Sequence, residues 1–148
     1  MKITQKMFFI ATMLVSVPYA LANSGEINLE EGPEIPQLST EELAAWIKEG
    51  KPLVLVDARG PESYAQEHLP RAINVPADQV ETLSATLPKQ ALIVVYCGGP
   101  KCPHSTVVAR WLVDRGWKRV RHYAEGISGW SQAGYPLERA GQPAGVSR

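Results

Sequence analysis

The sequence is poor in cysteine, histidine and aromatic residues, and it has no excess of charge of either sign. Its 148 residues include two cysteines, three histidines and 7% aromatic residues, and the formal net charge is zero. This balance gives no support for binding to nucleic acid or to an anionic membrane surface. One apolar run, residues 7–17, is too short to span a bilayer comfortably, and no second long run follows. We therefore expect the rest of the chain to be soluble.

The first 22 residues have the pattern of a secretory signal peptide. Lys2 and Lys6 precede the apolar run, Pro18 breaks it, and small residues flank Leu21. We predict cleavage after Ala22 and a periplasmic or secreted protein; an uncleaved anchor is the alternative. Removal of these 22 of the 148 residues leaves 126 and, with the two lysines gone, a formal charge of −2. That length fits one domain with its own core.

The remaining chain predicts one α/β domain. Residues 23–36 hold four glutamates and two prolines, so we predict a flexible lead-in over 23–35, the domain over 36–138 and a tail over 139–148. Within the domain, short apolar runs predict buried strands at 53–56, 73–75, 91–96 and 120–123. Helical periodicity and capping residues predict helices at 40–49, 61–66, 78–87, 105–115 and 126–133. This alternation is typical of a parallel sheet with helices on both faces.

The most informative stretch joins an apolar run to a cysteine. Residues 91–96 lead directly into Cys97, and a loop rich in glycine and proline follows before the helix predicted from Ser105. In a parallel sheet, ligands bind outside the carboxyl ends of the strands. Backbone N–H groups and the helix dipole stabilise a thiolate there. We therefore expect a reactive Cys97 thiol exposed within a ring of amide hydrogens; an inert buried thiol is the alternative.

Several ordered motifs resemble those of single-domain rhodaneses. The family has a hydrophobic strand, D-x-R, an aromatic residue and G-H-I-P-G-A-I-N, and its active-site cysteine ends a later strand. The matching residues here are Val54–Arg59, Tyr64, His68–Pro76, Val94–Cys97, Gly116–Val120, Gly126–Trp130 and Ala133–Leu137. The resemblance runs from about Pro36 to Glu138. It implies a rhodanese-like α/β fold, with a parallel sheet of about five strands and helices on both faces.

The cysteine loop departs from the family pattern. The common loop runs Cys-x-x-Gly-x-Arg-Ser, whereas this chain has Cys97-Gly98-Gly99-Pro100-Lys101-Cys102-Pro103-His104-Ser105. If Ser105 matches the loop-closing serine, the loop is two residues longer, gains a cysteine and lacks the arginine. It resembles an exported subgroup with Tyr-Cys-x-Gly-Pro-x-Cys-x-x-Ser. Phosphatases on a related fold use Cys-x5-Arg, and because Pro103 stands where that arginine would, we do not expect phosphatase activity.

The resemblance implies a sulfurtransferase in which Cys97 takes the outer sulfur of a donor such as thiosulfate and becomes a persulfide. Cyanide or another thiol, including one on a protein, would then remove that sulfur. Backbone amides of the loop would cradle the anion, and Gly98 and Gly99 allow the backbone conformations that this needs. Pro100 and Pro103 would stiffen the loop. Lys101 and His104 would supply the positive charge that the absent arginine does not.

Cys102 leaves three interpretations open. It could be a resolving thiol that attacks a persulfide or sulfenate on Cys97 and forms a disulfide. It could instead pair passively after export, although a bridge between residues five apart restricts the unfolded chain little. The third interpretation joins Cys97, Cys102 and His104 in a soft-metal site. Because no fourth ligand is evident, we predict no metal and no cofactor.

Two further groups lie near strand ends in the predicted fold. Asp57 and Arg59 follow the strand at 53–56, where they would shape the cleft or form an ion pair that fixes the loop. His68 is expected to be a structural hydrogen-bonding residue. The sequence thus predicts an exported rhodanese-like sulfurtransferase. The alternative is an accessory protein of the same fold that acts by thiol–disulfide redox chemistry or metal binding.

Overall fold

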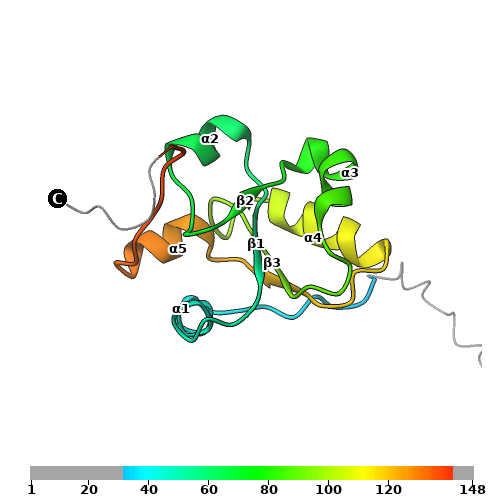
Figure 1. The fold of residues 1–148 in the computed structure, drawn as a ribbon, viewed down its shortest axis with the longest axis horizontal. Coiled ribbons are helices and arrows are strands. Elements are labelled where there is room, and N and C mark those ends of the chain that lie inside the picture. Colours follow the sequence, from blue (N-terminus) through cyan, green and yellow to red (C-terminus); the bar gives the residue numbers. More distant parts are fainter. Residues whose placement is uncertain (1–31, 142–148) are drawn as a thin grey trace, which may run out of the picture. The chain divides into compact units, whose positions relative to one another are not determined.

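The computed structural model describes residues 32–141, which form one α/β unit (Figure 1). Four parallel strands make up its sheet in the order β2-β1-β3-β4. Their bounds are β1 Val54–Asp57, β2 Ile73–Asn74, β3 Ile93–Tyr96 and β4 Val120–Tyr123. The predicted signal peptide, most of the predicted lead-in and residues 142–148 lie outside the described residues.

Helices cover both faces of this sheet, as predicted. The helices are α1 Thr40–Lys48, α2 Pro61–Gln66, α3 Val80–Leu83, α4 His104–Asp114 and α5 Gly126–Gln132, with 3₁₀ turns η1 Ala77–Gln79 and η2 Ser84–Thr86. Alternate residues of β3 enter different cores, because successive side chains of a strand point to opposite faces. Ile93 and Val95 pack with α3 and α4, and Val94 and Tyr96 pack with α1 and α5.

The sheet has one strand fewer than the predicted number of about five. The fifth position, beside β4, holds only an isolated parallel bridge between Gln37 and His122. Leu38 donates its N–H to the His122 carbonyl, and His122 donates to the carbonyl of Pro36. Pro36 lacks the N–H group that would extend this pairing toward the N-terminus, and α1 begins at Thr40, so pairing stops after one bridge.

Local sequence signals determine where several helices begin and end. Ser39 and Glu42 form the predicted capping box at α1, with the Glu42 carboxylate accepting from the Ser39 N–H at 2.9 Å. Gly116 follows α4 with a φ of 94°, a conformation that favours glycine. The single helix predicted over 78–87 is instead divided into η1, α3 and η2. In the part of the chain that the structure describes, no helix is both long and apolar enough to cross a membrane.

Candidate active site

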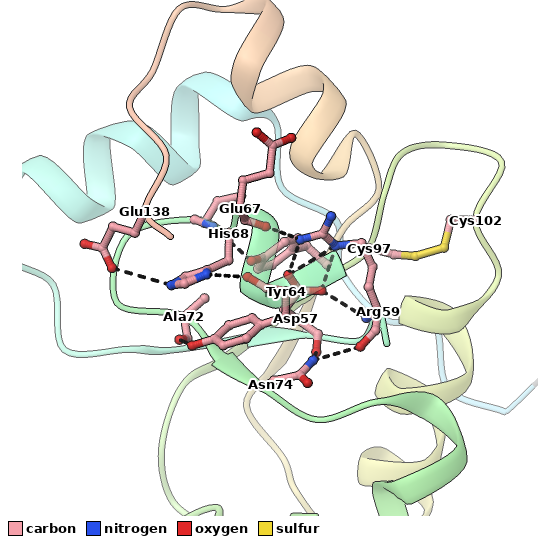
Figure 2. A network of polar contacts seen from close by, with 12 residues as sticks. Asp57, Arg59, Tyr64, Glu67, His68, Ala72, Asn74, Cys97, Cys102 and Glu138 are labelled. Carbon is pink, nitrogen blue, oxygen red and sulfur yellow. Dashed lines mark hydrogen bonds and ion pairs between the residues drawn. A yellow bond between two sulfur atoms is a disulfide. The ribbon is translucent and has the colours of Figure 1, made fainter. Parts of the chain in front are cut away.

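The carboxyl ends of β1 and β3 lie side by side and carry the two groups of residues singled out in the sequence. Asp57 ends β1 and pairs in register with Tyr96, the last residue of β3, so Cys97 follows immediately beyond that pair. The Ala58 N–H donates to the Tyr96 carbonyl at 2.9 Å. Figure 2 shows both groups in one view. The topology therefore places Cys97 at the edge of the sheet where ligands bind in parallel α/β folds.

Cys97 is bonded to Cys102 in a disulfide, with 6.2 Å between the two Cα atoms. Cys97 is 1% exposed, whereas Cys102 is partly exposed at the surface of the loop. The expectation of an exposed Cys97 thiol is therefore wrong for this state, because the bond and the loop cover the sulfur. The Cys97 side chain nevertheless points toward the loop, not into either hydrophobic core (Figure 2).

The loop after Cys97 keeps several backbone donors free. Its one internal hydrogen bond of the backbone runs from the Cys102 N–H to the Gly99 carbonyl at 3.0 Å. Within residues 32–141, the N–H groups of Gly98, Gly99 and Lys101 donate to no backbone carbonyl. A shallow depression, with mostly apolar walls, is lined by Gly99, Pro100, Lys101 and Cys102. Free amides around a sulfur at the start of a helix suit the binding of an anion.

The turn between β4 and α5, together with the first residues of α5, supports this loop. Ile127 donates its N–H to the Cys97 carbonyl at 2.9 Å, and Ser128 donates to the Gly98 carbonyl at 3.1 Å. Gly126 has a φ of 60°, and a Cβ atom there would overlap the Cys97 carbonyl and lie 2.8 Å from the Gly99 nitrogen. Only glycine therefore allows this close approach. The carbonyls of Cys97 and Gly98 are thus held by hydrogen bonds from α5.

The same turn is tied to α1 through side chains. The Glu125 carboxylate accepts a hydrogen bond from the Thr40 hydroxyl, which also contacts the buried Tyr123 hydroxyl at 2.7 Å. The Ser128 hydroxyl donates to the Glu125 carbonyl at 3.0 Å. The pKa of Tyr123 is raised, chiefly by burial, so its hydroxyl stays protonated at neutral pH. These contacts anchor the turn that supports the cysteine loop.

The N-terminal turn of α4 brings two further groups to the loop. His104 begins the helix, one residue earlier than predicted, and its side chain is exposed. Buried Ser105 follows, and its hydroxyl lies 2.9 Å from Nε2 of His122 on β4. Burial lowers the pKa of His122, so this imidazole is neutral at pH 7. The positive end of the α4 dipole faces the loop and favours negative charge on sulfur there.

The side chains of Cys97, Cys102 and His104 could also offer one ligand atom each to a metal. Their sulfur and ring nitrogen atoms all lie within 4.8 Å of one another. In the disulfide state, however, the two sulfurs are bonded to each other and are not thiolates. Thiolate, the form that binds metal, would have to be generated by reduction first.

Asp57 and Arg59 form a buried ion pair beside the loop. Nη2 of Arg59 lies 2.7 Å from the fully buried Asp57 carboxylate and donates to the Glu67 carbonyl at 2.6 Å. Burial by itself lowers the pKa of Arg59, but the hydrogen bonds and charge of Asp57 outweigh it, and that pKa is raised. The Arg59 side chain reaches the loop, at 4.0 Å from the Cβ position of Gly98. The Arg59 guanidinium nevertheless already donates hydrogen bonds to Asp57 and Glu67.

His68 belongs to a neighbouring polar cluster. Its ring stacks on Tyr64 with 4.0 Å between centroids, and Nδ1 lies 2.8 Å from the Tyr64 carbonyl. Nε2 is 3.8 Å from the Glu138 carboxylate, and the backbones of His68 and Glu138 form a bridge. These contacts tie the C-terminal segment to the segment after α2 (Figure 2). This is the structural role that the sequence predicts for His68.

The residues that support the loop carry little local sequence signal that reveals this role. Gly126 and Ser128 fall in a motif that carries the family resemblance, but their contacts with residues 97–99 join segments far apart in sequence. His122 stands in a basic run, and only the packing of α4 on β4 brings it to Ser105. Gly126, which follows the end of β4 by three residues, was the one available signal, because glycine permits a close backbone approach.

Taken together, the fold and the position of Cys97 indicate the family to which the chain belongs. A cysteine at the carboxyl end of the third strand in a parallel sheet, followed by an amide-rich loop and a helix, is what the resemblance to rhodaneses implies. Residues 39–133 match the family described as Rhodanese-like domain. The chain belongs to that family.

Among the relatives of this chain are a thiosulfate sulfurtransferase and a putative sulfur carrier protein. The chain is 29% identical over 99 residues to the thiosulfate sulfurtransferase GlpE of Coxiella burnetii, covering 66% of this chain and 90% of GlpE. It is 26% identical over 111 residues to the putative sulfur carrier protein YrkF of Bacillus subtilis, covering 75% of this chain but 59% of YrkF. The crystal structure of BH2092 from Bacillus halodurans superposes with a TM-score of 0.66 at 30% identity, covering 70% and 77% of the two chains.

Proposed function

We propose that this protein is an exported sulfurtransferase that carries sulfane sulfur as a persulfide on Cys97. The observation that carries the proposal is the placement of Cys97 at the end of β3, before free loop amides and the N-terminus of α4. Relatives named as a thiosulfate sulfurtransferase and a putative sulfur carrier support the same chemistry. Export follows from the predicted cleavage after Ala22.

In the first half-reaction, the reduced Cys97 thiolate attacks the outer sulfur of thiosulfate. The sulfur–sulfur bond of thiosulfate breaks, sulfite leaves with the bonding electrons, and Cys97 holds an anionic persulfide. In the second half-reaction, cyanide or a thiol attacks the outer sulfur and restores the Cys97 thiolate. This is covalent catalysis by double displacement.

The loop residues supply the positive potential that both half-reactions need. The N–H groups of Gly98, Gly99 and Lys101 are free to donate to the donor anion and then to the persulfide. The exposed Lys101 side chain adds positive charge at the rim of the depression, and the exposed His104 follows at the start of α4. Lysine offers a point charge where an arginine would clamp the anion with two parallel hydrogen bonds. We therefore expect weaker binding of thiosulfate than an arginine loop would provide.

Intact mass measurement tests the proposal. The reduced protein is freed of reductant, incubated with thiosulfate without oxygen, and weighed, together with Cys97→Ser and Cys102→Ser variants. We expect the Cys102→Ser variant to gain one sulfur atom, and the Cys97→Ser variant to gain none. Cyanide should then remove that atom as thiocyanate. If Cys102→Ser shows no gain in mass, the proposed sulfur transfer is wrong.

The disulfide favours a second candidate function. A protein whose Cys97 and Cys102 are already bonded could act as a thiol–disulfide accessory without sulfur transfer. Such a protein would exchange the bond reversibly with a dithiol and yet leave thiosulfate unchanged. The same mass measurement separates the two functions, because the accessory would gain no sulfur in either cysteine variant.

A further inference from the structure

We propose that Cys102 resolves the Cys97 persulfide, so that the protein releases the transferred sulfur as hydrosulfide and ends as the observed disulfide. This inference rests on the proposed function, because it needs the persulfide to form first. It adds a product, since the sulfur leaves as hydrosulfide and not only on an acceptor. It also adds a requirement, since two electrons must return to the disulfide after each cycle.

The geometry of the loop supports direct attack by Cys102. The bond joins the two Sγ atoms, so Cys102 reaches the sulfur that would be the inner one of the persulfide. The separation of the Cα atoms, 6.2 Å, lies within the usual range for disulfides, so no rearrangement of the domain is needed. A turn held by the Cys102 N–H and the Gly99 carbonyl folds Cys102 back over Cys97.

A purely structural role explains this disulfide less well. A bridge closing so small a loop restricts the unfolded chain far less than one that joins distant segments. The carbonyls of Cys97 and Gly98 are moreover already held by Ile127 and Ser128. The loop thus has backbone support that does not depend on the disulfide, so the bond is free to open and close.

The proposed step balances without an external oxidant. The Cys102 thiolate attacks Sγ of Cys97, a bond forms between the two Sγ atoms, and the bond from Cys97 to the outer sulfur breaks. The outer sulfur leaves with the electron pair and takes the proton that Cys102 gave up, as hydrosulfide. Together with the first half-reaction, one thiosulfate and two thiols give sulfite, hydrogen sulfide and one disulfide. Thiosulfate is reduced, and the two cysteines are oxidised.

His104 is placed to carry that proton. One of its ring nitrogens lies within 4.8 Å of both sulfurs, and the side chain is exposed and so free to approach them. A neutral imidazole can accept the Cys102 proton and pass it to the departing sulfur. Regeneration then requires a dithiol reductant, either a small molecule or a thiol–disulfide oxidoreductase. The reaction that follows must consume sulfide or sulfite.

A single-turnover experiment tests the inference. Reduced wild-type protein, freed of other thiols and of oxygen, is mixed with excess thiosulfate, and sulfide, sulfite and free thiols are measured. We expect one equivalent each of sulfide and sulfite for each protein, and loss of both thiols. Cys102→Ser and Cys102→Ala should keep a stable persulfide and release no sulfide. His104→Gln should slow sulfide release by about tenfold or more.

The outcomes separate this inference from the proposed function. If wild-type protein keeps the added sulfur and releases no sulfide, the resolving role of Cys102 is wrong while persulfide formation stands. If the Cys102 variants gain no sulfur either, the proposed function itself is wrong. Equal sulfide release by wild-type and Cys102→Ser protein would also overturn the inference, because the sulfide would then come without the second thiol.

Discussion

Two adjacent strand ends in this sheet differ in how their polar groups are used. At the end of β1, the Asp57 carboxylate accepts hydrogen bonds from Arg59, and Asn74 donates to the carbonyls of both residues. At the end of β3, the carbonyls of Cys97 and Gly98 are paired with α5, but the N–H groups of Gly98, Gly99 and Lys101 donate to no backbone carbonyl within residues 32–141. One end is saturated with protein partners, and the other keeps its donors for a ligand.

This difference indicates that the β1 end contributes to the stability of the domain and the β3 end to the reactivity of the site. A buried charge is tolerable only when the protein satisfies it, so the paired end fixes the backbone near the site. Backbone donors without a protein partner cost little while water can reach them, and they can bind an anion when one arrives. We therefore expect changes at the β1 end to lower stability, and changes at the β3 end to lower reactivity.

The largest expected effect is on the stability of Asp57→Asn. Loss of the carboxylate leaves the Arg59 guanidinium, whose side chain is 12% exposed, without its countercharge. The free energy of unfolding should fall by about 3 kcal/mol, measured by urea denaturation. The rate of persulfide formation, measured for folded protein, should change by less than about threefold, a difference of under ~0.7 kcal/mol in activation free energy.

Glu67→Gln is the control for that substitution, because Arg59 contacts the carbonyl of Glu67 and not its carboxylate. Its effect on the free energy of unfolding should stay within about 0.5 kcal/mol. Should Asp57→Asn instead abolish persulfide formation while stability is unchanged, the β1 end would belong to the reactive site. Stability and reactivity would then not be divided between the two strand ends.

The second effect concerns the turn that supports the loop. In Gly126→Ala, the added methyl group would meet the Cys97 carbonyl and the Gly99 amide, and so displace the loop. Persulfide formation in the reduced protein should slow by about 10- to 100-fold, because small misplacements of reacting groups have effects of this size. Stopped-flow measurement of sulfite release gives the rate directly.

Gly134→Ala is the matched control. Gly134 also has a positive φ, 80°, but nothing lies within 4 Å of its Cβ position. The variant should lose about 1 kcal/mol of stability from backbone strain and keep its rate of persulfide formation. Equal slowing in both variants would show that strain, and not contact with the loop, limits the reaction.

The smallest effect is a dependence of stability on pH through His122. Burial lowers its folded pKa, so the unfolded chain binds the proton more readily. Its contribution is fully present above the unfolded value near ~6.5 and is lost as pH falls toward the lower folded value. The slope should not exceed about 1.4 kcal/mol for each pH unit. Urea denaturation of wild type and His122→Asn at pH 8 and pH 5.5 should show a smaller loss on acidification in the variant.

Much of the fold could be predicted because its signals are local. The capping box at Ser39, the prolines and glycines at element ends, and the apolar runs predict the helices and strands to within a few residues. The apolar runs predict the four strands that are found, and only the family resemblance implied about five. The division of the helix expected over 78–87, and the pairing of residue 37 beside β4 through a single bridge, were not predictable from local signals. Both depend on how a segment packs or pairs with distant parts of the chain.

The chemical nature of the site is contained in the sequence itself. It places Cys97 after a buried strand and Cys102 five residues later, in a loop of glycine and proline without arginine. Only the tertiary structure decided that Ile127 and Ser128 hold the carbonyls of that loop, that Gly126 allows their close approach, and that Ser105 meets His122. The physical reason is distance along the chain. Residue types and sequence neighbours can be read directly from the sequence. Contacts between β4, α5 and the loop form only after the sheet brings its strand ends together.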